Sequence, residues 1–378
     1  MILEFLSKIA NYRLAYHGLV RPARPLTLTF SVTNQCQSRC QTCRIWELYR
    51  TKPDIKDTEL TLDEIAKIFR SIGHTYFFNI SGGEPFLRRD LPQIVALALQ
   101  HLTPRIVHIP TNALSPDLVE QGTRAILEIM HQTENSSVPL TVKPSLDGIG
   151  EQHDRIRGVK GNFEKVLDVV ERLKRIREQY PNLHVELGTV ISTANVDSIA
   201  EIADFVQTLE VESYRNEIAE TRAEFFNLDD PITPSAELYA EAIQGFQQRI
   251  HANIHRQRKL TRMTEALRLV YYDYAIRILK EKRQVIPCLA GISNVHINPY
   301  GQVWPCCTLG YDHPMGELRQ VDYDFDLVWH SEQAQLVRQF IRDKNCICPL
   351  ANQMYSNIMG NPGAVLRVAS NFVHLQKR

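Results

Sequence analysis

The stretch "LTLTFSVTNQCQSRCQTC", residues 26–43, joins a strand pattern to a dense group of cysteines. Apolar and β-branched residues fill its first half, which predicts a buried strand over 26–33. Cys36, Cys40 and Cys43 follow immediately, three thiols within eight residues. Ligand sites in parallel α/β sheets lie at the carboxyl ends of strands, so these cysteines stand where a site is expected.

Similar apolar runs predict five more strands downstream, over residues 75–80, 105–110, 140–145, 184–191 and 211–220. Helical patterns lie between them. In "TLDEIAKIFRSI", Thr61 is the expected N-cap and Glu64 completes a capping box. Repeated strand–helix units predict an α/β fold with a parallel sheet and right-handed crossovers. Six units are too few for a closed eight-stranded barrel, so we expect an open, partial (β/α)6 barrel of the TIM type.

The remainder of the chain changes character after the predicted barrel. Residues 235–285 show a helical pattern and form a connector, in which "YYDY" at 271–274 is more simply explained by helix packing than by ligand contact. A region rich in Gly, Pro and Cys then predicts a small C-terminal domain. The expected units are an N-terminal amphipathic segment (1–25), the barrel (26–234), the connector (235–285), the small domain (286–350) and a tail (351–378).

The composition narrows the possible functions. The formal net charge of zero gives no reason to expect a nucleic-acid partner. No apolar run approaches the roughly 20 residues of a transmembrane helix. Glu4, Lys8 and Arg13 make the N-terminus too polar for a secretory signal, so we expect a cytoplasmic protein. Clustered cysteines in a reducing compartment are more often metal ligands than disulfides.

The first cysteine group has the spacing C-x3-C-x2-C. Zinc sites usually pair two local C-x2-C units, and no second pair lies nearby. Three thiolates around one corner suit a [4Fe–4S] cluster that keeps one iron open. A second motif, "ISGGEPFLRRD" at 80–90, follows the second predicted strand. Its Gly82 and Gly83 let the backbone approach a ligand closely, and Glu84 can accept hydrogen bonds from an ammonium group.

Together with "SLDGIGEQHDRIRG" at 145–158, these motifs resemble the radical S-adenosylmethionine (SAM) enzymes. In that family three cysteines hold a [4Fe–4S] cluster, and the amino and carboxylate groups of SAM chelate the fourth iron. The resemblance implies reductive cleavage of SAM to methionine and a 5′-deoxyadenosyl radical that abstracts a substrate hydrogen. It also implies an external reductant of the flavodoxin or ferredoxin type.

The resemblance assigns the cluster to Cys36, Cys40 and Cys43, and it implies a set of SAM contacts. These are Gly82, Gly83, Glu84, Thr111, Asn112, Ser145, Arg157, Thr189 and Ile191. An Arg fork suits a carboxylate, although a surface salt bridge is the alternative for Arg157. Many members carry an aromatic residue just before the third cysteine; here that residue is Thr42, and Trp46 or a backbone group would replace the contact.

A second cysteine group follows the long cysteine-free middle of the chain. Its "C…G-x4-C" element resembles the start of a SPASM or twitch auxiliary domain, with Gly301 four residues before the second cysteine. The thiolates that would hold an auxiliary [4Fe–4S] cluster for electron transfer are Cys288, Cys306, Cys346 and Cys348. A structural zinc is the chemical alternative. Cys307 either replaces Cys306 or is a buried free thiol.

The polar run "YRNEIAETRAEFF" at 214–226 lies after the sixth predicted strand, at the expected mouth of the cavity. Its charged side chains are the candidates for binding or deprotonating a substrate: Arg215, Glu217, Glu220, Arg222 and Glu224. A solvated salt-bridge network is the simpler alternative for any one of them. Arg88 and Arg89, beside the GGEP motif, are similar candidates.

The resemblance implies an oxidation or bond-forming modification of a small molecule or peptide. Three other functions stay open. A loose apolar stripe near the N-terminus either docks on the protein or rests on a membrane surface, which would favour a lipid substrate; it comprises Ile2, Phe5, Leu6, Ile9 and Tyr16. The chain could also be a non-catalytic iron–sulfur carrier or a zinc-stabilised binding module. A carrier needs no SAM pocket, so GGEP, Ser145 and Arg157 argue against it.

Overall fold

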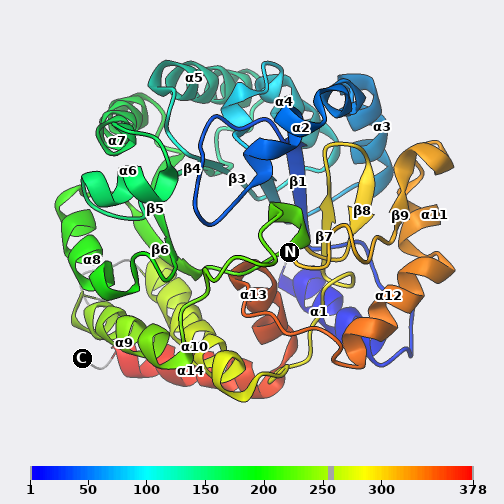
Figure 1. Ribbon diagram of the computed structural model, residues 1–378. Coiled ribbons are helices and arrows are strands. Elements are labelled where there is room, and N and C mark those ends of the chain that lie inside the picture. Colours follow the sequence, from blue (N-terminus) through cyan, green and yellow to red (C-terminus); the bar gives the residue numbers. More distant parts are fainter. Residues whose placement is uncertain (1, 254–258, 377–378) are drawn as a thin grey trace.

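The computed structural model describes residues 2–253 and 259–376 of the chain. Figure 1 shows a ring of strands with helices outside it and the C-terminal region beside the first strand. The parallel barrel strands are β1 (Thr27–Thr33), β2 (Phe77–Gly82), β3 (Ile106–Thr111), β4 (Leu140–Pro144), β5 (Leu183–Ile191) and β6 (Ser213–Ile218). Every predicted strand is present, and the partial (β/α)6 barrel is confirmed.

Alternation along β1 decides which side of the barrel each residue faces. Leu28, Phe30 and Val32 are buried in the main core. There the ring of Phe30 packs edge-on against Phe69, at 5.1 Å between centroids. The intervening residues are polar, and Ser31 points to the interior, where its Oγ lies 2.8 Å from His296 Nε2. The strand is therefore apolar toward the helices and polar toward the barrel interior.

Helices connect the strands on the outside of the barrel. They are α3 (Leu62–Ile72), α4 (Leu91–His101), α5 (Pro116–Gln132), α6 (Glu151–Arg157), α7 (Asn162–Gln179) and α8 (Ile199–Thr208). The predicted capping box begins α3: Thr61 Oγ1 accepts from Glu64 N at 3.3 Å, and Glu64 Oε2 accepts from Thr61 N at 2.8 Å. A short helix, α2 (Leu48–Thr51), follows the cysteine loop.

Helices also close the gap between β6 and the C-terminal strands. The connector consists of α9 (Ala236–Asn253) and α10 (Lys259–Glu281), and α13 (Ala351–Gly360) and α14 (Pro362–Gln376) pack against α10. Tyr271 and Tyr272 are fully buried, and the ring of Tyr271 lies 5.5 Å from that of Tyr355 on α13. The "YYDY" stretch is therefore helix-packing core, as predicted.

The C-terminal domain continues the barrel sheet. It contains β7 (Asn294–Ile297), β8 (Gln302–Trp304), β9 (Gly316–Glu317), α11 (Phe325–Trp329) and α12 (Glu332–Arg342). β7 pairs in parallel with β1, and β8 and β9 follow as antiparallel neighbours. One nine-stranded sheet, in the order β6-β5-β4-β3-β2-β1-β7-β8-β9, thus joins the two cysteine-bearing regions.

The N-terminal helix α1 (Ile2–Tyr16) docks on the protein itself. Phe5, Ile9 and Tyr16 pack against a small core that includes Leu26 and Leu289. Leu6 is exposed, and the side chain of Ile2 lies outside the described part. The apolar stripe is thus largely used within the molecule. No helix in the described residues is long and apolar enough to cross a membrane.

Truncating Leu28 on β1 should strongly destabilise the fold, because its side chain is fully buried in the main core. We expect Leu28→Ala to lower the free energy of unfolding by about 2–5 kcal/mol, measured by urea denaturation. Leu336→Ala on α12, where the side chain is 60% exposed, should change it by less than about 0.5 kcal/mol. Equal stability of the two variants would contradict the position of β1.

Candidate functional site

The first cysteine group lies in the loop after β1, at the carboxyl end of the barrel (Figure 1). Backbone N–H groups of this loop donate hydrogen bonds to carbonyls at the end of α6. Arg39 N donates to Arg157 O at 3.0 Å, and Gln41 N donates to Ile156 O at 2.9 Å. A Cβ on Gly158 would lie 2.2 Å from Arg39 O, so only glycine permits this approach. The "RIRG" motif therefore shapes the cysteine loop from the far side of the barrel.

The thiols of Cys36, Cys40 and Cys43 lie close to one another. Burial raises the pKa of Cys36 to about 12, and the neighbouring Cys40 raises it further. Burial and Cys40 also hold the pKa of Cys43 well above its usual value. The described cysteines form no disulfide. Three partly buried thiols at this spacing can ionise together when a metal binds them, so the donor set fits an iron–sulfur cluster with three protein ligands.

The GGEP turn lies directly against the cysteine loop. Gly83 N donates to Thr33 O at 2.7 Å, and Glu84 N donates to Gln35 O at 2.8 Å. A Cβ would stand 2.1 Å from Thr33 O if placed on Gly82, and 2.3 Å from Gln35 O if placed on Gly83. The two glycines are therefore required for the close approach of the two loops.

Glu84 contacts Thr111 and Asn112, two other predicted SAM contacts that lie in a different part of the sequence. Its carboxylate is buried and accepts from Thr111 Oγ1 at 2.9 Å and from Asn112 N at 2.7 Å. Burial raises its pKa to about 7, and these hydrogen bonds oppose the rise. Asn112 Nδ2 also donates to Cys36 Sγ at 3.5 Å. Glu84, Thr111 and Asn112 thus adjoin the cysteine loop.

Arg157 is buried beside the same loop. Burial alone would lower the pKa of its guanidinium, but the charges of Cys40 and Asp147 raise it above the usual value. Nη1 donates to Asp147 Oδ2 at 3.0 Å, whereas Nε has no hydrogen-bond partner among the described residues. Ser145 follows β4, and its N donates to Thr111 O at 3.0 Å. Arg157 is therefore an internal cation next to the thiols, which excludes the surface salt bridge considered from the sequence.

Thr189 and Ile191 on β5 lie apart from these contacts. Ile191 is fully buried in the main core. Thr189 Oγ1 donates to Leu146 O, and it lies 2.8 Å from the hydroxyl of Tyr214, whose ring packs on Phe246 of α9. Both side chains are thus occupied by packing toward the helices, and their contact with SAM stays a prediction.

Thr42 occupies the position at which many family members carry an aromatic residue, and Trp46 follows the cysteine loop four residues later. Thr42 O accepts from Asn227 Nδ2 at 2.8 Å, which fixes the backbone before the third cysteine. The Trp46 indole Nε1 is buried and has no hydrogen-bond partner within residues 2–253 and 259–376. The guanidinium of Arg50 lies 5.4 Å from the Trp46 ring.

The second cysteine group gathers four thiols from three segments of the C-terminal domain. Burial raises the pKa of Cys288 to about 12, and Cys346 raises it further. Burial holds the pKa of Cys306 well above its usual value, and the nearby thiols of Cys307, Cys288 and Cys346 raise it further. Burial and Glu220 raise the pKa of Cys348, and Cys306 adds to the effect. Gln284 Nε2 donates to Cys346 Sγ at 3.3 Å. The set fits one fully ligated cluster.

Cys307 faces a different neighbourhood from Cys306. Arg222 Nη1 donates to Cys307 Sγ at 3.2 Å. After burial, the charges that act on Cys307 are those of Arg222, Glu224 and Glu220. Its side chain therefore faces the polar segment after β6, and Cys306 is the better candidate of the two for the cluster.

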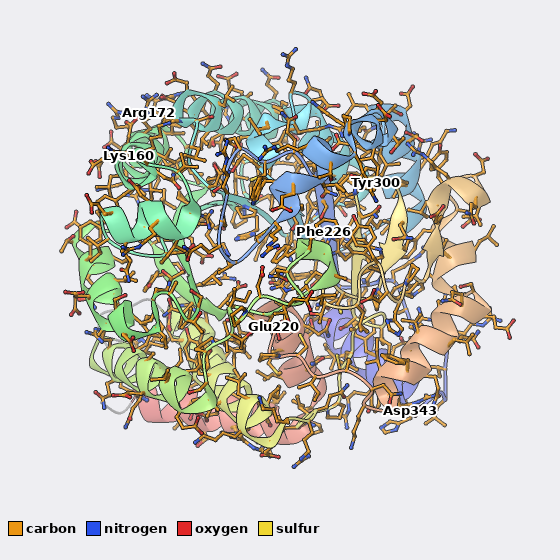
Figure 2. The ribbon with its side chains drawn as sticks, viewed as in Figure 1. Lys160, Arg172, Glu220, Phe226, Tyr300 and Asp343 are labelled. Carbon is orange, nitrogen blue, oxygen red and sulfur yellow. The ribbon has the colours of Figure 1, made fainter. Side chains whose placement is uncertain are left out.

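That segment, residues 219–224, runs between the two thiol groups. At one end Glu220 Oε2 accepts from Cys348 Sγ at 3.4 Å. At the other, the charge of Glu224 contributes to the raised pKa of Cys43. Figure 2 shows Glu220 near the middle of the molecule, between the barrel and the C-terminal domain. Both carboxyls are buried, which raises each pKa to about 7.

The other predicted substrate residues belong to a charged barrel interior. Arg215 Nε lies 2.9 Å from Glu186 Oε2 on β5, and Glu217 Oε1 lies 3.6 Å from Lys143 Nζ on β4. His108 on β3 lies 3.7 Å from Glu186. Sequence reasoning missed Lys143, Glu186 and His108. The available signal was a polar residue at every second position of otherwise apolar strands.

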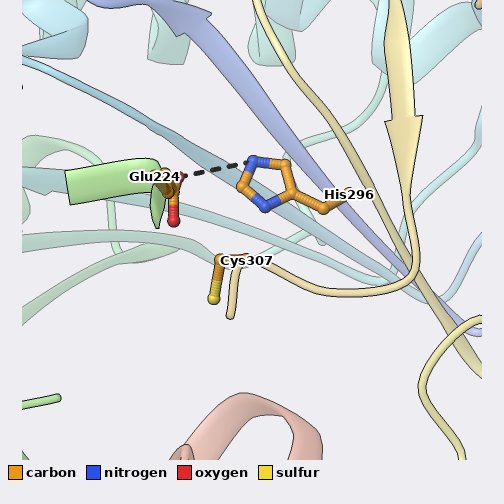
Figure 3. Close-up of side chains that lie close together, drawn as sticks. All are labelled: Glu224, His296 and Cys307. Carbon is orange, nitrogen blue, oxygen red and sulfur yellow. Dashed lines mark ion pairs between the residues drawn. The ribbon is translucent and has the colours of Figure 1, made fainter. Parts of the chain in front are cut away.

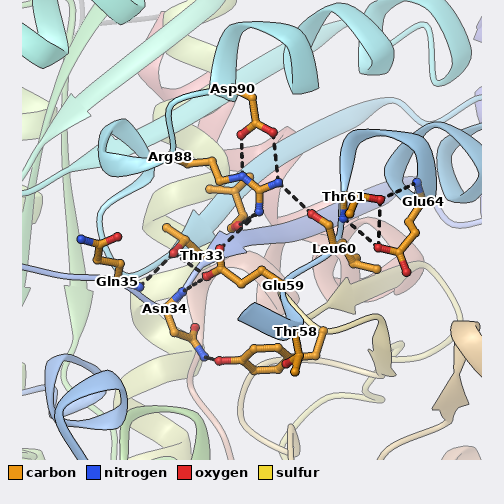
Figure 4. Close-up of polar contacts among 12 residues, drawn as sticks. Thr33, Asn34, Gln35, Thr58, Glu59, Leu60, Thr61, Glu64, Arg88 and Asp90 are labelled. Atoms are coloured by element: carbon orange, nitrogen blue, oxygen red, sulfur yellow. Dashed lines mark hydrogen bonds and ion pairs between the residues drawn. The ribbon is translucent and has the colours of Figure 1, made fainter. Parts of the chain in front are cut away.

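Arg88 has a structural role, which Figure 4 shows. Its guanidinium donates to Asp90 Oδ1 at 2.6 Å and to Glu59 Oε2 at 3.3 Å. Glu59 Oε1 accepts from Thr33 Oγ1 at 2.6 Å and also from Tyr49. This network fixes the start of the cysteine loop, so Arg88 is not free for substrate. Arg88 and Arg89 both line a cavity of about 740 Å³ beside the GGEP turn, and Arg89 has no such network among the described residues.

Two thiol groups held by a partial α/β barrel and an attached small domain define an iron–sulfur protein. The profile of the radical SAM superfamily matches residues 30–206, and that of the SPASM iron–sulfur cluster-binding domain matches residues 288–349. The chain therefore contains a radical SAM domain followed by a SPASM domain. Radical SAM domains bind a [4Fe–4S] cluster with SAM, and SPASM domains bind auxiliary clusters.

Named relatives agree with this domain assignment. The Fe-coproporphyrin III synthase of Methanosarcina barkeri is 29% identical over 48% of this chain and 40% of its own length. The subtilosin biosynthesis protein AlbA of Bacillus subtilis is 19% identical over 93% of this chain and 71% of its own. The chain spans only about 40% of the first two curated relatives that it matches.

Among solved structures, SuiB of Streptococcus suis bound to SAM has a TM-score of 0.58 at 14% identity, covering 87% of this chain and 70% of SuiB. This likeness shows the shared fold. SuiB has also been solved with its precursor peptide SuiA.

The contact between the GGEP turn and the cysteine loop can be tested with Gly83→Ala. Its Cβ would stand 2.3 Å from Gln35 O and displace the loop. After anaerobic reconstitution we expect about eight irons per chain in the wild type, as two [4Fe–4S] clusters, and about four in this variant. Gly245→Ala on α9, whose Cβ would meet only the end of Arg249 at 3.5 Å, should keep the wild-type iron content. Full iron in Gly83→Ala would contradict the steric argument.

Proposed function

We propose that the chain is a radical SAM enzyme whose reactive cluster is held by Cys36, Cys40 and Cys43. The observation that carries the proposal is the group of three neighbouring, partly buried thiols against a glycine turn that presents a buried carboxylate. Three thiolates leave one iron of a [4Fe–4S] cluster open. When bound, the cluster and SAM supply reductive cleavage of SAM to methionine and a 5′-deoxyadenosyl radical, which abstracts a substrate hydrogen.

The residues around the loop have distinct tasks in this proposal. Glu84 accepts hydrogen bonds from the SAM amino group, because Thr111 and Asn112 hold its carboxylate in place. Arg157 presents a buried positive charge to the SAM carboxylate, and Ser145 contributes from the end of β4. Gly82 and Gly83 provide the backbone surface, and Thr189 and Ile191 support the far wall through β5.

Cys288, Cys306, Cys346 and Cys348 hold the auxiliary [4Fe–4S] cluster in this proposal. Four thiolates leave no iron open to the substrate, so this cluster transfers electrons. The segment with Glu220, Arg222 and Glu224 lies between the two thiol groups, which makes it the wall of the substrate site.

The substrate that fits this interior best is a polar small molecule or a peptide. The buried Glu186 and the half-buried Arg215, Glu217 and Lys143 line the barrel with charge, and such an interior offers little to a lipid chain. SuiB, solved with a precursor peptide, and the porphyrin synthase show both classes among similar proteins. The stripe on α1 is largely packed away, which weakens the membrane alternative. A flavodoxin- or ferredoxin-type reductant and a cytoplasmic location complete the proposal.

Replacing one cysteine from each group should separate the roles of the two clusters. Cys36→Ala should abolish the release of 5′-deoxyadenosine from SAM under reducing conditions, measured by liquid chromatography. Cys348→Ala should lose about four irons per chain yet still cleave SAM. Cleavage of SAM by Cys36→Ala would refute the assignment of the first cluster.

Glu84→Gln should weaken SAM binding while the cluster stays intact. Loss of a charge-assisted hydrogen bond should raise the Kd for SAM about 10- to 100-fold, measured by equilibrium dialysis of the reconstituted protein. Glu186→Gln removes a buried carboxylate that pairs with Arg215 instead, and its Kd should match that of the wild type. An unchanged Kd in Glu84→Gln would exclude this carboxylate as a SAM contact.

A further inference from the structure

Glu224, His296 and Cys307 converge in the interior from three different segments, as Figure 3 shows. Glu224 lies on the short 3-10 helix η5 (Ala223–Phe225), His296 on β7, and Cys307 in the turn after β8. One potential ligand atom from each residue lies within 4.8 Å of the other two. Glu224 is 5% exposed and His296 is 2% exposed. A carboxylate, an imidazole and a thiol thus share one buried spot.

This group lacks the hydrogen bonds that buried polar atoms normally have. Glu224 Oε2 and His296 Nδ1 have no hydrogen-bond partner in the part of the chain that the structure describes. The other ring nitrogen, Nε2, lies 2.8 Å from Ser31 Oγ and 3.8 Å from Glu224 Oε1. Buried polar atoms without a hydrogen bond are costly, so these two atoms indicate a ligand.

The charged groups around this site indicate that the ligand is a cation. Arg222 is the cation among these residues, with Nη1 3.2 Å from Cys307 Sγ and 3.9 Å from Glu224 Oε2. Its Nε lies 4.0 Å from a second carboxylate, that of Glu220. One guanidinium can balance only one of these two carboxylates. A divalent cation between Glu224 and Cys307 would supply further positive charge beside both.

We propose that Cys307, His296 and Glu224 form a third metal site, which binds a zinc-type divalent transition metal. Thiolate and imidazole together select such a metal over Mg²⁺ or Ca²⁺. Three protein ligands with one open position is the arrangement of reactive zinc sites. Ligand atoms around a tetrahedral zinc lie about 3.5 Å apart, so small side-chain rotations close the site.

Neighbouring groups are placed to support these three ligands. Ser31 Oγ can accept a hydrogen bond from His296 Nε2–H. In that tautomer the lone pair of Nδ1 is free to bind the metal. Arg222 Nη1 donates to Cys307 Sγ, which is a favourable contact for a metal-bound thiolate. The open position would take water or an oxygen or nitrogen donor of a polar ligand. Metal binding here does not require the proposed radical chemistry, but Glu224 also belongs to the proposed wall of the substrate site, so the metal would face the substrate.

The test is the metal content of the reconstituted wild-type protein. After anaerobic iron–sulfur reconstitution, the protein is incubated with one equivalent of ZnCl₂, desalted and analysed by mass spectrometry of the metals. We expect one zinc per chain in addition to an unchanged iron content. Absence of retained zinc in the wild type overturns the proposal.

Variants then locate the zinc. Cys307→Ser and His296→Gln should lose the zinc and keep the wild-type iron content and visible absorbance. His108→Gln is the matched control, because this buried histidine pairs with Glu186 elsewhere in the interior, and it should retain the zinc. If either replacement also lowers the iron content, Glu224→Gln takes its place in the comparison.

Three outcomes overturn the assignment. Zinc retained in Cys307→Ser with iron unchanged places the metal elsewhere. Zinc lost equally in His108→Gln shows nonspecific binding. Loss of about four irons in Cys307→Ser without loss of zinc makes Cys307 an auxiliary-cluster ligand. A Co²⁺ electron paramagnetic resonance signal that disappears in Cys307→Ser supports the site, because oxidised [4Fe–4S] clusters are diamagnetic.

Discussion

The parallel pairing of β1 with β7 is the contact on which the rest of this structure depends. It extends the barrel sheet into the C-terminal domain in a fixed register, with Thr29 opposite His296 and Phe30 opposite Ile297. The cysteine loop leaves the end of β1, and the hairpin that carries Cys306 and Cys307 begins at β7. Backbone hydrogen bonds therefore set the separation of the two thiol groups, which side chains alone could not hold constant.

The interior between those groups is polar because of the same alternation that makes the barrel stable. Each strand turns its apolar residues to the helices and its other residues inward. Thr33 anchors Glu59, Ser31 contacts His296, and Lys143 pairs with Glu217. Charged residues at these positions cost stability unless they are paired. Their presence at the centre of the molecule is consistent with a site that holds polar ligands.

Sequence reasoning succeeded where a local pattern carries the information. Apolar runs and the Thr61 capping box located the strands and α3, and glycine spacing located the GGEP turn. It failed where position depends on distant pairing. Lys143 and Glu186 are of residue types that usually lie on the surface, and only the closure of the barrel places them inside. The spacing from Gly301 favours Cys306 over Cys307 as the cluster ligand, but the contact of Cys307 with Arg222 depends on the turn after β8, which no local pattern reveals.

The helices α13 and α14 pack on α10 and complete the wall between β6 and the C-terminal strands. During synthesis they emerge from the ribosome after everything that they cover. The barrel strands and both thiol groups are therefore complete while one side of the interior is still uncovered. Iron and sulfide could enter through that side before the helices dock, so the order of translation provides a natural interval for cofactor loading.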